Sequence, residues 1–266
     1  MRGWIAAGGL FFVYVAAVSM ILRGLAARQR WLALGGAAAG LLLCWFAHLR
    51  PYHAVLHDWI LPPLVLLLAY WTGGLLFVRP MPGAERILDG IDRLLAIDRV
   101  AAAIPRWLAE VLELAYVGVY PLIPIALGIY LLSTAQADVD RFWTVVLVTD
   151  VICFGFLPWI QTRPPRAFRS ADPWIARVRR LNMKLLGAVS IQVNTFPSGH
   201  AAEALAAALL LTDAPGPVVA WMFANAVLIS AGAVFGRYHY AADAVAGWVV
   251  ALGVWSTLVL SSGRAA

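Results

Sequence analysis

Residues 197–243 read PSGHAAEALAAALLLTDAPGPVVAWMFANAVLISAGAVFGRYHYAAD. Two short polar clusters bound this stretch: Pro-Ser-Gly-His at 197–200 and Arg-Tyr-His-Tyr-Ala-Ala-Asp at 237–243. Between them lie two apolar runs, 201–212 and 217–235, joined by a turn that contains proline and glycine. Two such runs predict a helical hairpin, so both polar clusters return to the same side of whatever the helices cross.

The composition is that of a protein embedded in a bilayer. Apolar residues make up 62% of the 266 residues, charged residues make up 13%, and the mean hydropathy is +0.81. A soluble domain does not need so much hydrocarbon. Because lipid-exposed backbone must satisfy its hydrogen bonds internally, the spans are expected to be helices. The predicted fold class is an all-α, polytopic bundle of transmembrane helices.

The apolar runs approach or reach the roughly 20 residues that a helix needs to cross a bilayer. They predict about eight spans, at 3–22, 31–49, 59–78, 112–132, 142–161, 198–212, 217–235 and 243–261. Two connections, 79–110 and 171–190, carry apolar residues at helical spacing and predict amphipathic helices that lie along the interface. In the second, the apolar stripe is expected to lie opposite Arg177, Arg179 and Arg180.

An even number of spans places both termini on one side and four loops on the other, at 23–30, 79–110, 162–197 and 236–242. The first two of these loops carry eight arginines, whereas the opposite side carries four. The positive-inside rule therefore predicts that the face with the polar clusters is cytoplasmic.

The first polar cluster can bind an anion. A glycine beside a serine at a helix start offers backbone N–H groups and a hydroxyl, and the helix dipole adds to the attraction. These groups belong to Ser198 and Gly199, and His200 follows at the mouth, where it can give or accept a proton. Taken alone, the four residues are a weak signal and are more typical of a helix cap followed by an interfacial histidine.

The second cluster adds a paired histidine. His239 and Asp243 are four residues apart, so they share one face if a helix begins there. A carboxylate that holds one imidazole nitrogen leaves the other nitrogen as a nucleophile or a base. Arg237 is close enough in sequence to contribute charge to the same site.

A third polar patch, Thr-Arg-Pro-Pro-Arg at 162–166, falls on the same side by span counting. The guanidinium groups of Arg163 and Arg166 suit phosphate oxygens through paired hydrogen bonds. Pro164 and Pro165 hold the segment out of a helix and fix where the arginines point. Two histidines, a carboxylate, a Ser-Gly turn and several arginines on one membrane face predict chemistry on a phosphate.

These clusters resemble the three signature motifs of the type-2 phosphatidic acid phosphatase superfamily, which contains integral-membrane lipid phosphatases and related phosphotransferases. The matching residues are Arg163-Pro164, the Pro-Ser-Gly-His of 197–200 and the His-x-x-x-Asp of 239–243. The chain is therefore divided into residues 1–111, with three spans and one interfacial helix, and a phosphatase-like membrane core at 112–266.

The resemblance implies a role for each motif residue. His239 would attack phosphorus and form a phosphohistidine, Asp243 would orient it, and His200 would protonate the leaving alkoxide. The phosphate oxygens would be held by Arg163, Ser198 and the Gly199 amide. Chemistry in this family is usually metal-independent, with arginines stabilising the charge, so neither a metal nor a cofactor is expected.

Two positions depart from the family pattern. The lysine seven residues before the Arg-Pro arginine is Phe156 here, and the arginine six residues before the nucleophile is Ala233. Arg166 and Arg237 are the nearby residues expected to supply these charges. The compact His-Tyr-x-x-Asp at 239–243 also resembles the inositol-phosphorylceramide and sphingomyelin synthase branch, which passes a phosphoryl headgroup to an alcohol instead of water.

The sequence thus predicts an enzyme that hydrolyses a lipid phosphate, either a monoester or a diphosphate, with headgroup transfer to an alcohol as the alternative. Its expected partners are the lipid phosphate and the bilayer, no nucleic acid is expected, and the oligomeric state is left open. The expected location is the cell membrane, as a multi-pass protein of a bacterial inner membrane. The resemblance also allows an outward-facing site, against the arginine count.

Two other classes of protein rank lower. His200-x-x-Glu203 and His239-x-x-x-Asp243 each present two ligands on one helical face, as in a helix-bundle metal site. That reading leaves the Ser-Gly turn and the arginines unexplained. A lipid or anion transporter would carry polar residues deep in several spans and a repeat, and the sequence has one such acid and no repeat.

The deep acid is Asp150, which lies mid-span among valines and isoleucines. It is either a functional intramembrane acid, paired with Arg163 or Asn225, or a member of an interhelical hydrogen bond. Glu203 follows His200 by three residues and either supports that histidine or faces interfacial water.

Overall fold

The computed structural model describes residues 2–134, 137–169 and 172–260. These residues form helices and no β-strand, which confirms the all-α class. The helices are α1 (Gly3–Ile21), α2 (Ala27–Leu49), a π-helical segment (Val55–Ile60) continuing as α3 (Leu61–Gly74), α4 (Pro82–Leu94), α5 (Ile97–Ala103), α6 (Arg106–Val117), α7 (Val119–Ser133), α8 (Val139–Gly155), α9 (Arg177–Val189), α10 (Gly199–Leu210), α11 (Gly216–Phe235), α12 (Ala241–Trp255) and a π-helical end at Ser256–Leu260.

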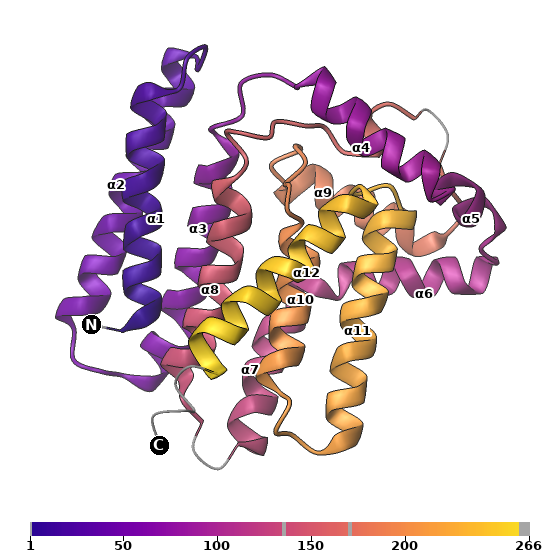
Figure 1. Ribbon diagram of the computed structural model, residues 1–266. Coiled ribbons are helices and arrows are strands. Elements are labelled where there is room, and N and C mark those ends of the chain that lie inside the picture. Colours follow the sequence, from indigo (N-terminus) through magenta and orange to yellow (C-terminus); the bar gives the residue numbers. More distant parts are fainter. Residues whose placement is uncertain (1, 135–136, 170–171, 261–266) are drawn as a thin grey trace.

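The long helices run side by side and alternate in direction (Figure 1). Helix α8 is central, since it contacts α1, α3, α10 and α12. The turn after α1, helices α4, α5 and α9, and the turn after α11 lie toward one end of the bundle, whereas the N-terminus and the α10–α11 turn lie at the other (Figure 1). The predicted grouping of the loops agrees with this arrangement, and the assignment of that end to the cytoplasm stays a prediction.

Among the described residues, five helical stretches are long and apolar enough to cross a bilayer: α1, α2, Val55–Gly74, α11 and Ala241–Leu258. The pair α6–α7 makes a sixth if the two helices are counted as one span. Helices α8 and α10 have 17 and 12 residues and are shorter than this measure requires. The count of eight therefore stays a prediction.

Two predicted spans have wrong boundaries. The run at 112–132 is broken between α6 and α7, whose axes differ by 65°. Pro121 has no N–H with which to continue the hydrogen bonding of α6, and Pro124 lies inside α7. The run at 142–161 ends as a helix at Gly155, because Pro158 cannot donate the next helical bond.

The interfacial helices also differ in detail from the prediction. Residues 79–110 form α4 and α5, separated at Ala96, which has a left-handed φ of 53°. Residues 171–190 contain α9, but Arg179, expected on the polar face, is buried (4% exposed). Residues 171 and 261, included in two predicted elements, lie outside the described residues.

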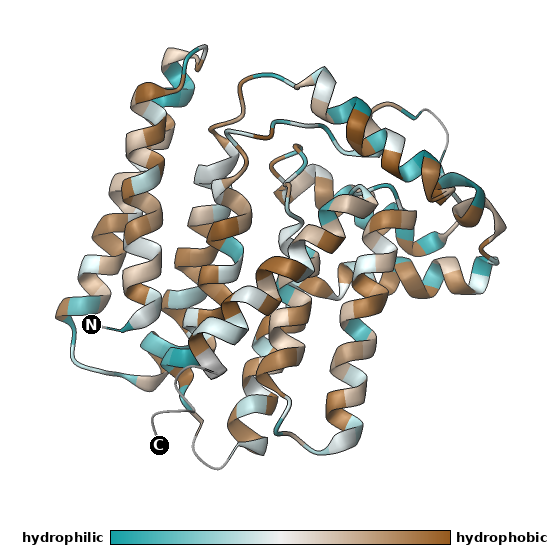
Figure 2. Cartoon of the chain, viewed as in Figure 1, coloured by the Kyte–Doolittle hydropathy of each residue, from teal (hydrophilic) through white to brown (hydrophobic). Residues whose placement is uncertain are grey.

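Helix α4 turns two of its acids toward the protein and two of its large apolar side chains outward. Ile87 and Leu94 are 67% and 85% exposed, whereas Glu85 and Asp92 are buried. Figure 2 shows hydrophilic and hydrophobic residues mixed along α4, whereas α11 is hydrophobic over most of its length. An outward apolar face is expected for a helix that lies in the membrane interface.

Asp92 joins α4 to the start of α12. One carboxylate oxygen of Asp92 accepts a hydrogen bond of 2.9 Å from the backbone N–H of Ala241. Burial raises the pKa of Asp92 from its ordinary 3.8 to about 6, and the neighbouring charge of Asp243 acts in the same direction. Ionisation of the Asp92 carboxyl therefore destabilises the folded protein.

Helices α10 and α12 touch at Gly247. A Cβ at Gly247 would lie 2.5 Å from the carbonyl oxygen of Ser198 and 3.2 Å from the backbone nitrogen of Ala202. The absence of a side chain thus lets α12 lie directly on the first turn of α10, which brings the two polar clusters together.

We expect Gly247→Ala to destabilise the protein by about 1–3 kcal/mol, because the atoms that its methyl group meets are backbone atoms that cannot rotate away. The matched control is Gly253→Ala, on the same helix with nothing within 4 Å of its Cβ. The control should change stability by no more than about 1 kcal/mol, in the favourable direction. Thermal unfolding in detergent measures both, and equal effects of the two substitutions would contradict the close contact.

We expect Asp92→Asn to stabilise the protein at pH 7.5 and to have little effect at pH 4. Because the pKa of Asp92 is higher in the folded state than in the unfolded state, folding favours the neutral carboxyl. This contribution to stability is fully present below the ordinary pKa of 3.8 and is lost as the pH rises through about 6. A shift of this size corresponds to roughly 2–3 kcal/mol. Unfolding temperatures of the two proteins at both pH values test this, and a difference that does not change with pH would disprove it.

Candidate active site

His239 lies in the short turn between α11 and α12. Arg237 has a left-handed φ of 63°, which reverses the chain, and the backbone N–H groups of Tyr238 and His239 both donate to the carbonyl of Ala233, at 2.8 and 2.9 Å. The His239 side chain is buried, and its Nδ1 lies 3.4 Å from Oδ2 of Asp243 on the first turn of α12. This carboxylate orients the ring and leaves Nε2 as the nitrogen available for chemistry.

Asp243 is the acceptor for several other donors. Its Oδ2 accepts from the backbone N–H of Tyr240, at 2.9 Å, and from Nδ2 of Asn194, also at 2.9 Å. Asn194 also donates to Oγ1 of Thr162 at 3.0 Å, and their backbones form an isolated antiparallel bridge. Through Asn194 the segment that leads into Arg163 is tied to the histidine pair.

The Ser-Gly turn lies beside the same carboxylate. The backbone N–H of Ser198 donates to the backbone carbonyl of Asp243 at 2.9 Å, and the Ser198 hydroxyl caps α10 by accepting from Ala201. A Cβ at Gly199 would lie 3.2 Å from the Phe154 ring, so α10 starts close against α8. As predicted, Ser198 and Gly199 form the N-terminus of a helix, with its positive dipole end at the site.

The two histidines face each other across the site. The ring centroids of His200 and His239 are 6.0 Å apart. On its other sides His200 stacks against Tyr116, at 5.5 Å, and meets the edge of Tyr120, at 6.1 Å. Tyr116 in turn stacks on Tyr238 at 4.1 Å and an interplanar angle of 4°. The pairing of the two histidines, predicted from separate motifs, is thus present in the structure.

Arg163, expected to bind phosphate, is held by a carboxylate. Its backbone N–H, Nε and Nη2 all donate to the buried Glu85 of α4, at 2.9, 3.1 and 3.1 Å. Its guanidinium also lies over the Phe168 ring, 4.3 Å from the centroid. The sequence does not reveal Glu85 as the partner of Arg163, because this ion pair joins residues 78 positions apart.

Arg237 is also engaged by an acid. Its Nη2 lies 2.9 Å from Asp98 of α5, which pairs with Arg169 as well. Arg169 has a second ion pair with Asp89, at 2.8 Å. Asp89 also pairs with Arg93, at 3.1 Å, so the predicted phosphate ligand Arg237 is part of a network that includes three arginines and two aspartates.

Arg166 differs from these arginines, because no carboxylate of the described chain lies within ion-pair distance of it. Its Nη1 donates to the carbonyl of Tyr238 at 3.4 Å, and its guanidinium lies 5.6 Å from the centroid of the Tyr238 ring. Burial lowers the pKa of Arg166 from its usual high value. A partly buried guanidinium without a counter-ion, next to the Tyr238–Tyr116–His200 stack, is suited to receive an anion.

A buried network fixes the position of Tyr238. Its hydroxyl donates to Glu113 at 2.6 Å, and burial raises the pKa of this phenol, so it stays neutral. Glu113 also pairs with Arg179 at 2.9 Å, and Arg179 donates to the Gly236 carbonyl at 3.1 Å. The arginine predicted to face solvent therefore holds the turn that carries His239. The sequence signal for this network is Glu113 itself, because an acid inside an apolar run needs a partner.

Asp150 has neither of the partners considered from the sequence. Arg163 pairs with Glu85, and the Asn225 amide donates to the carbonyl of Trp221 on its own helix, at 2.8 Å. Asp150 is buried, its Oδ2 accepts no hydrogen bond from the described residues, and Glu203 is its charged neighbour. In the described ranges no group of three or more His, Cys, Asp or Glu side chains is placed to hold a metal ion.

The comparisons with known proteins agree with this geometry. The model of the PAP2 superfamily matches residues 87–257, a range that begins in α4 and contains the three motifs. Searches of curated proteins and of solved structures return no match. The match spans more than half of the chain and contains both histidines, so this protein belongs to the PAP2 superfamily of membrane phosphatases and related phosphotransferases.

Proposed function

We propose that the protein hydrolyses a lipid phosphate, a monoester or a diphosphate, through a phosphohistidine and without a metal ion. The observation that carries this proposal is the pairing of two histidines, one held by a buried carboxylate and the other 6.0 Å away at the start of a helix. Arg166, which has no counter-ion in the described chain, lies beside the Tyr238 ring of the aromatic stack.

In the first step Nε2 of His239 attacks phosphorus, and the bond from phosphorus to the lipid oxygen breaks. His200 gives its proton to the leaving alkoxide, which departs as an alcohol. In the second step His200 takes a proton from water, which attacks the phosphohistidine and releases phosphate together with neutral His239. Asp243 holds Nδ1 in both steps and so keeps Nε2 directed at phosphorus.

The phosphate oxygens would be held by Arg166, the Ser198 hydroxyl and the Gly199 N–H at the helix start. Preformed donors aimed at developing charge commonly contribute a factor of about 10²–10³ each. Arg163 and Arg237 add to the positive field, but the carboxylates of Glu85 and Asp98 offset part of their charge. We therefore assign the direct charge contact to Arg166.

The same first step serves transfer to an alcohol. The compact His-Tyr-x-x-Asp of 239–243 and the burial of His239 (5% exposed) favour this as the second candidate, because a buried phosphohistidine is shielded from bulk water. The two activities differ only in whether water or a hydroxyl group accepts the phosphoryl group.

We expect purified protein to release phosphate from at least one member of a panel of lipid phosphates with chelator present, and His239→Ala to abolish this release, by about a thousandfold or more. The matched control is His48→Ala, an exposed histidine at the other end of the bundle, which should keep full activity. Loss of wild-type activity on adding chelator would contradict the proposal. Headgroup exchange that requires an added alcohol would instead identify the transferase.

We expect Arg166→Gln to lower kcat/KM by about 10²–10³. The comparison is the double variant Glu85→Gln/Arg163→Gln, which removes the ion pair without leaving a buried charge and should cost no more than about tenfold. Steady-state phosphate release measures both. If the double variant loses as much activity as Arg166→Gln, Arg163 and not Arg166 is the main phosphate ligand.

A further inference from the structure

We propose that Tyr116 is a positioning residue for His200, the proposed acid. The Tyr116 ring fixes the plane of the imidazole and stabilises its protonated form. This inference rests on the proposed function and assigns a role to a tyrosine that lies outside the three motifs.

His200 must carry a proton before it can give one to the leaving alkoxide. Its surroundings make that proton costly. Asp243 pairs with His239, and no carboxylate of the described chain lies within ion-pair distance of His200. Arg166, a charged neighbour of His200, has the same sign of charge as an imidazolium. Another group therefore has to compensate for the positive charge in this partly buried place.

The ring of Tyr116 supplies this compensation. Its centroid lies 5.5 Å from that of His200, and the two planes are 20° apart, so the rings are stacked. The face of a phenol ring carries partial negative charge and attracts a cation that lies within about 6 Å of the centroid. A neutral imidazole gains only ordinary stacking, so the contact favours the protonated form of His200. The proton leaves when an alkoxide, a much stronger base, develops beside it.

Tyr116 is itself held by a second ring. The Tyr238 ring is parallel to it, at a centroid distance of 4.1 Å and an interplanar angle of 4°. Both tyrosines are buried, and the Tyr238 hydroxyl donates to Glu113 at 2.6 Å. Because Tyr238 is fixed by packing and by this hydrogen bond, the plane of Tyr116 is fixed as well.

The same anchor serves both histidines. Tyr238 precedes His239 in the chain, so its hydrogen bond to Glu113 also holds the turn that carries the proposed nucleophile. Through Tyr116, the ring of Tyr238 supports the proposed acid. The 6.0 Å separation of the two histidine rings is therefore set from one point.

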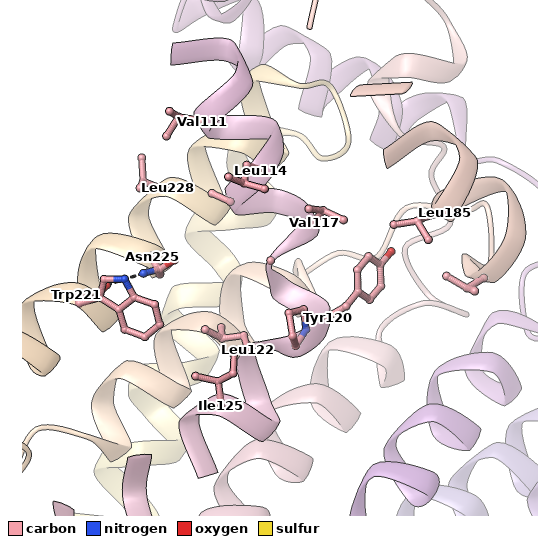
Figure 3. Close-up of a pocket in the computed structure, with 14 residues that line it drawn as sticks. Val111, Leu114, Val117, Tyr120, Leu122, Ile125, Leu185, Trp221, Asn225 and Leu228 are labelled. Carbon is pink, nitrogen blue, oxygen red and sulfur yellow. Dashed lines mark hydrogen bonds between the residues drawn. The ribbon is translucent and has the colours of Figure 1, made fainter. Parts of the chain in front are cut away.

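The bend between α6 and α7 places a second tyrosine against His200. Tyr116 and Tyr120 are four residues apart and would lie side by side on a straight helix. The 65° turn at Gly118 separates them, and Figure 3 shows the chain leaving the helix between Val117 and Tyr120. Tyr120 meets the imidazole at 87° and a centroid distance of 6.1 Å, whereas Tyr116 is nearly parallel to it. The two rings therefore restrain the imidazole in two directions.

The test uses the fact that only a poor leaving group needs the acid. The first substrate is the lipid phosphate that is hydrolysed fastest. The second is its analogue with sulphur in place of the oxygen that leaves, because a thiolate departs without a proton. We expect Tyr116→Leu to lower kcat/KM for the oxygen ester by about thirtyfold and for the sulphur analogue by less than about threefold. The ratio kcat/KM covers the step in which this bond breaks.

Two variants serve as controls. Tyr116→Phe keeps the ring and should stay within about threefold of wild type on both substrates. Tyr130→Leu removes a buried tyrosine of α7 whose ring contacts Phe142 at 5.4 Å, toward the other end of that helix. It should destabilise the protein about as much as Tyr116→Leu does and leave kcat/KM on both substrates within about twofold of wild type.

Equal losses on the two substrates would overturn the inference, because Tyr116 would then support the fold or the binding of phosphate and not the acid. So would a loss in Tyr116→Phe as large as that in Tyr116→Leu. Absence of phosphate release by the wild type from every lipid phosphate would contradict the proposed function instead, and a second measurement then tests the stack alone.

That second measurement is proton NMR of the His200 ring, whose resonance is assigned by comparison with His200→Gln. The ring current of Tyr116 should shift this resonance in the wild type and in Tyr116→Phe, and Tyr116→Leu should remove the shift. An unchanged resonance in Tyr116→Leu would reject the stack, and with it the role of Tyr116, whether or not the protein is active.

Discussion

The buried carboxylate of Asp243 is the group on which the arrangement of the site depends. A carboxylate without solvent is costly unless donors surround it. Here the donors are Asn194, the backbone of Tyr240 and the ring of His239, and the backbone of Asp243 accepts from Ser198. The three bonds to the side chain all go to Oδ2. The donors come from two of the motifs, 197–200 and 237–243, and from Asn194, which also holds Thr162 of the third motif, so one acid fixes the relative positions of all three.

Charge pairing among the arginines imposes a second constraint. Glu85 of α4, Asp98 of α5 and Glu113 of α6 each hold an arginine from the site or its supporting turn. These acids belong to helices that carry no motif, and α4 precedes the predicted core at 112. The match to the superfamily begins in α4, in agreement with its contacts, and the division of the chain at residue 111 stays a prediction.

The sequence predicts what local pattern controls. The hairpin follows from alternating apolar runs and polar clusters, and the shared face of His239 and Asp243 follows from their spacing on a helix turn. The partner of Arg163 does not follow, because its ion pair depends on where two distant segments meet. The bend at Gly118 can be predicted only in part. Pro121 and Pro124 indicate a break in the helix, but the hydropathy of the run is that of one continuous span.

The aromatic stack of His200, Tyr116 and Tyr238 links the histidine pair to Arg166, and its surroundings bear on the proposed acceptor of the phosphoryl group. Burial of the Arg166 guanidinium would strengthen its electrostatic attraction for a phosphate. The pocket beside Arg166 is lined by four arginines, whereas the groove beside Tyr120, between α6, α7, α9 and α11, has mostly aliphatic side chains. A polar acceptor such as water suits the first environment, and the alcohol end of a lipid suits the second. Because both proposed reactions use the same histidine chemistry, the choice between hydrolysis and transfer would depend on which acceptor reaches the proposed phosphohistidine once the first product has left.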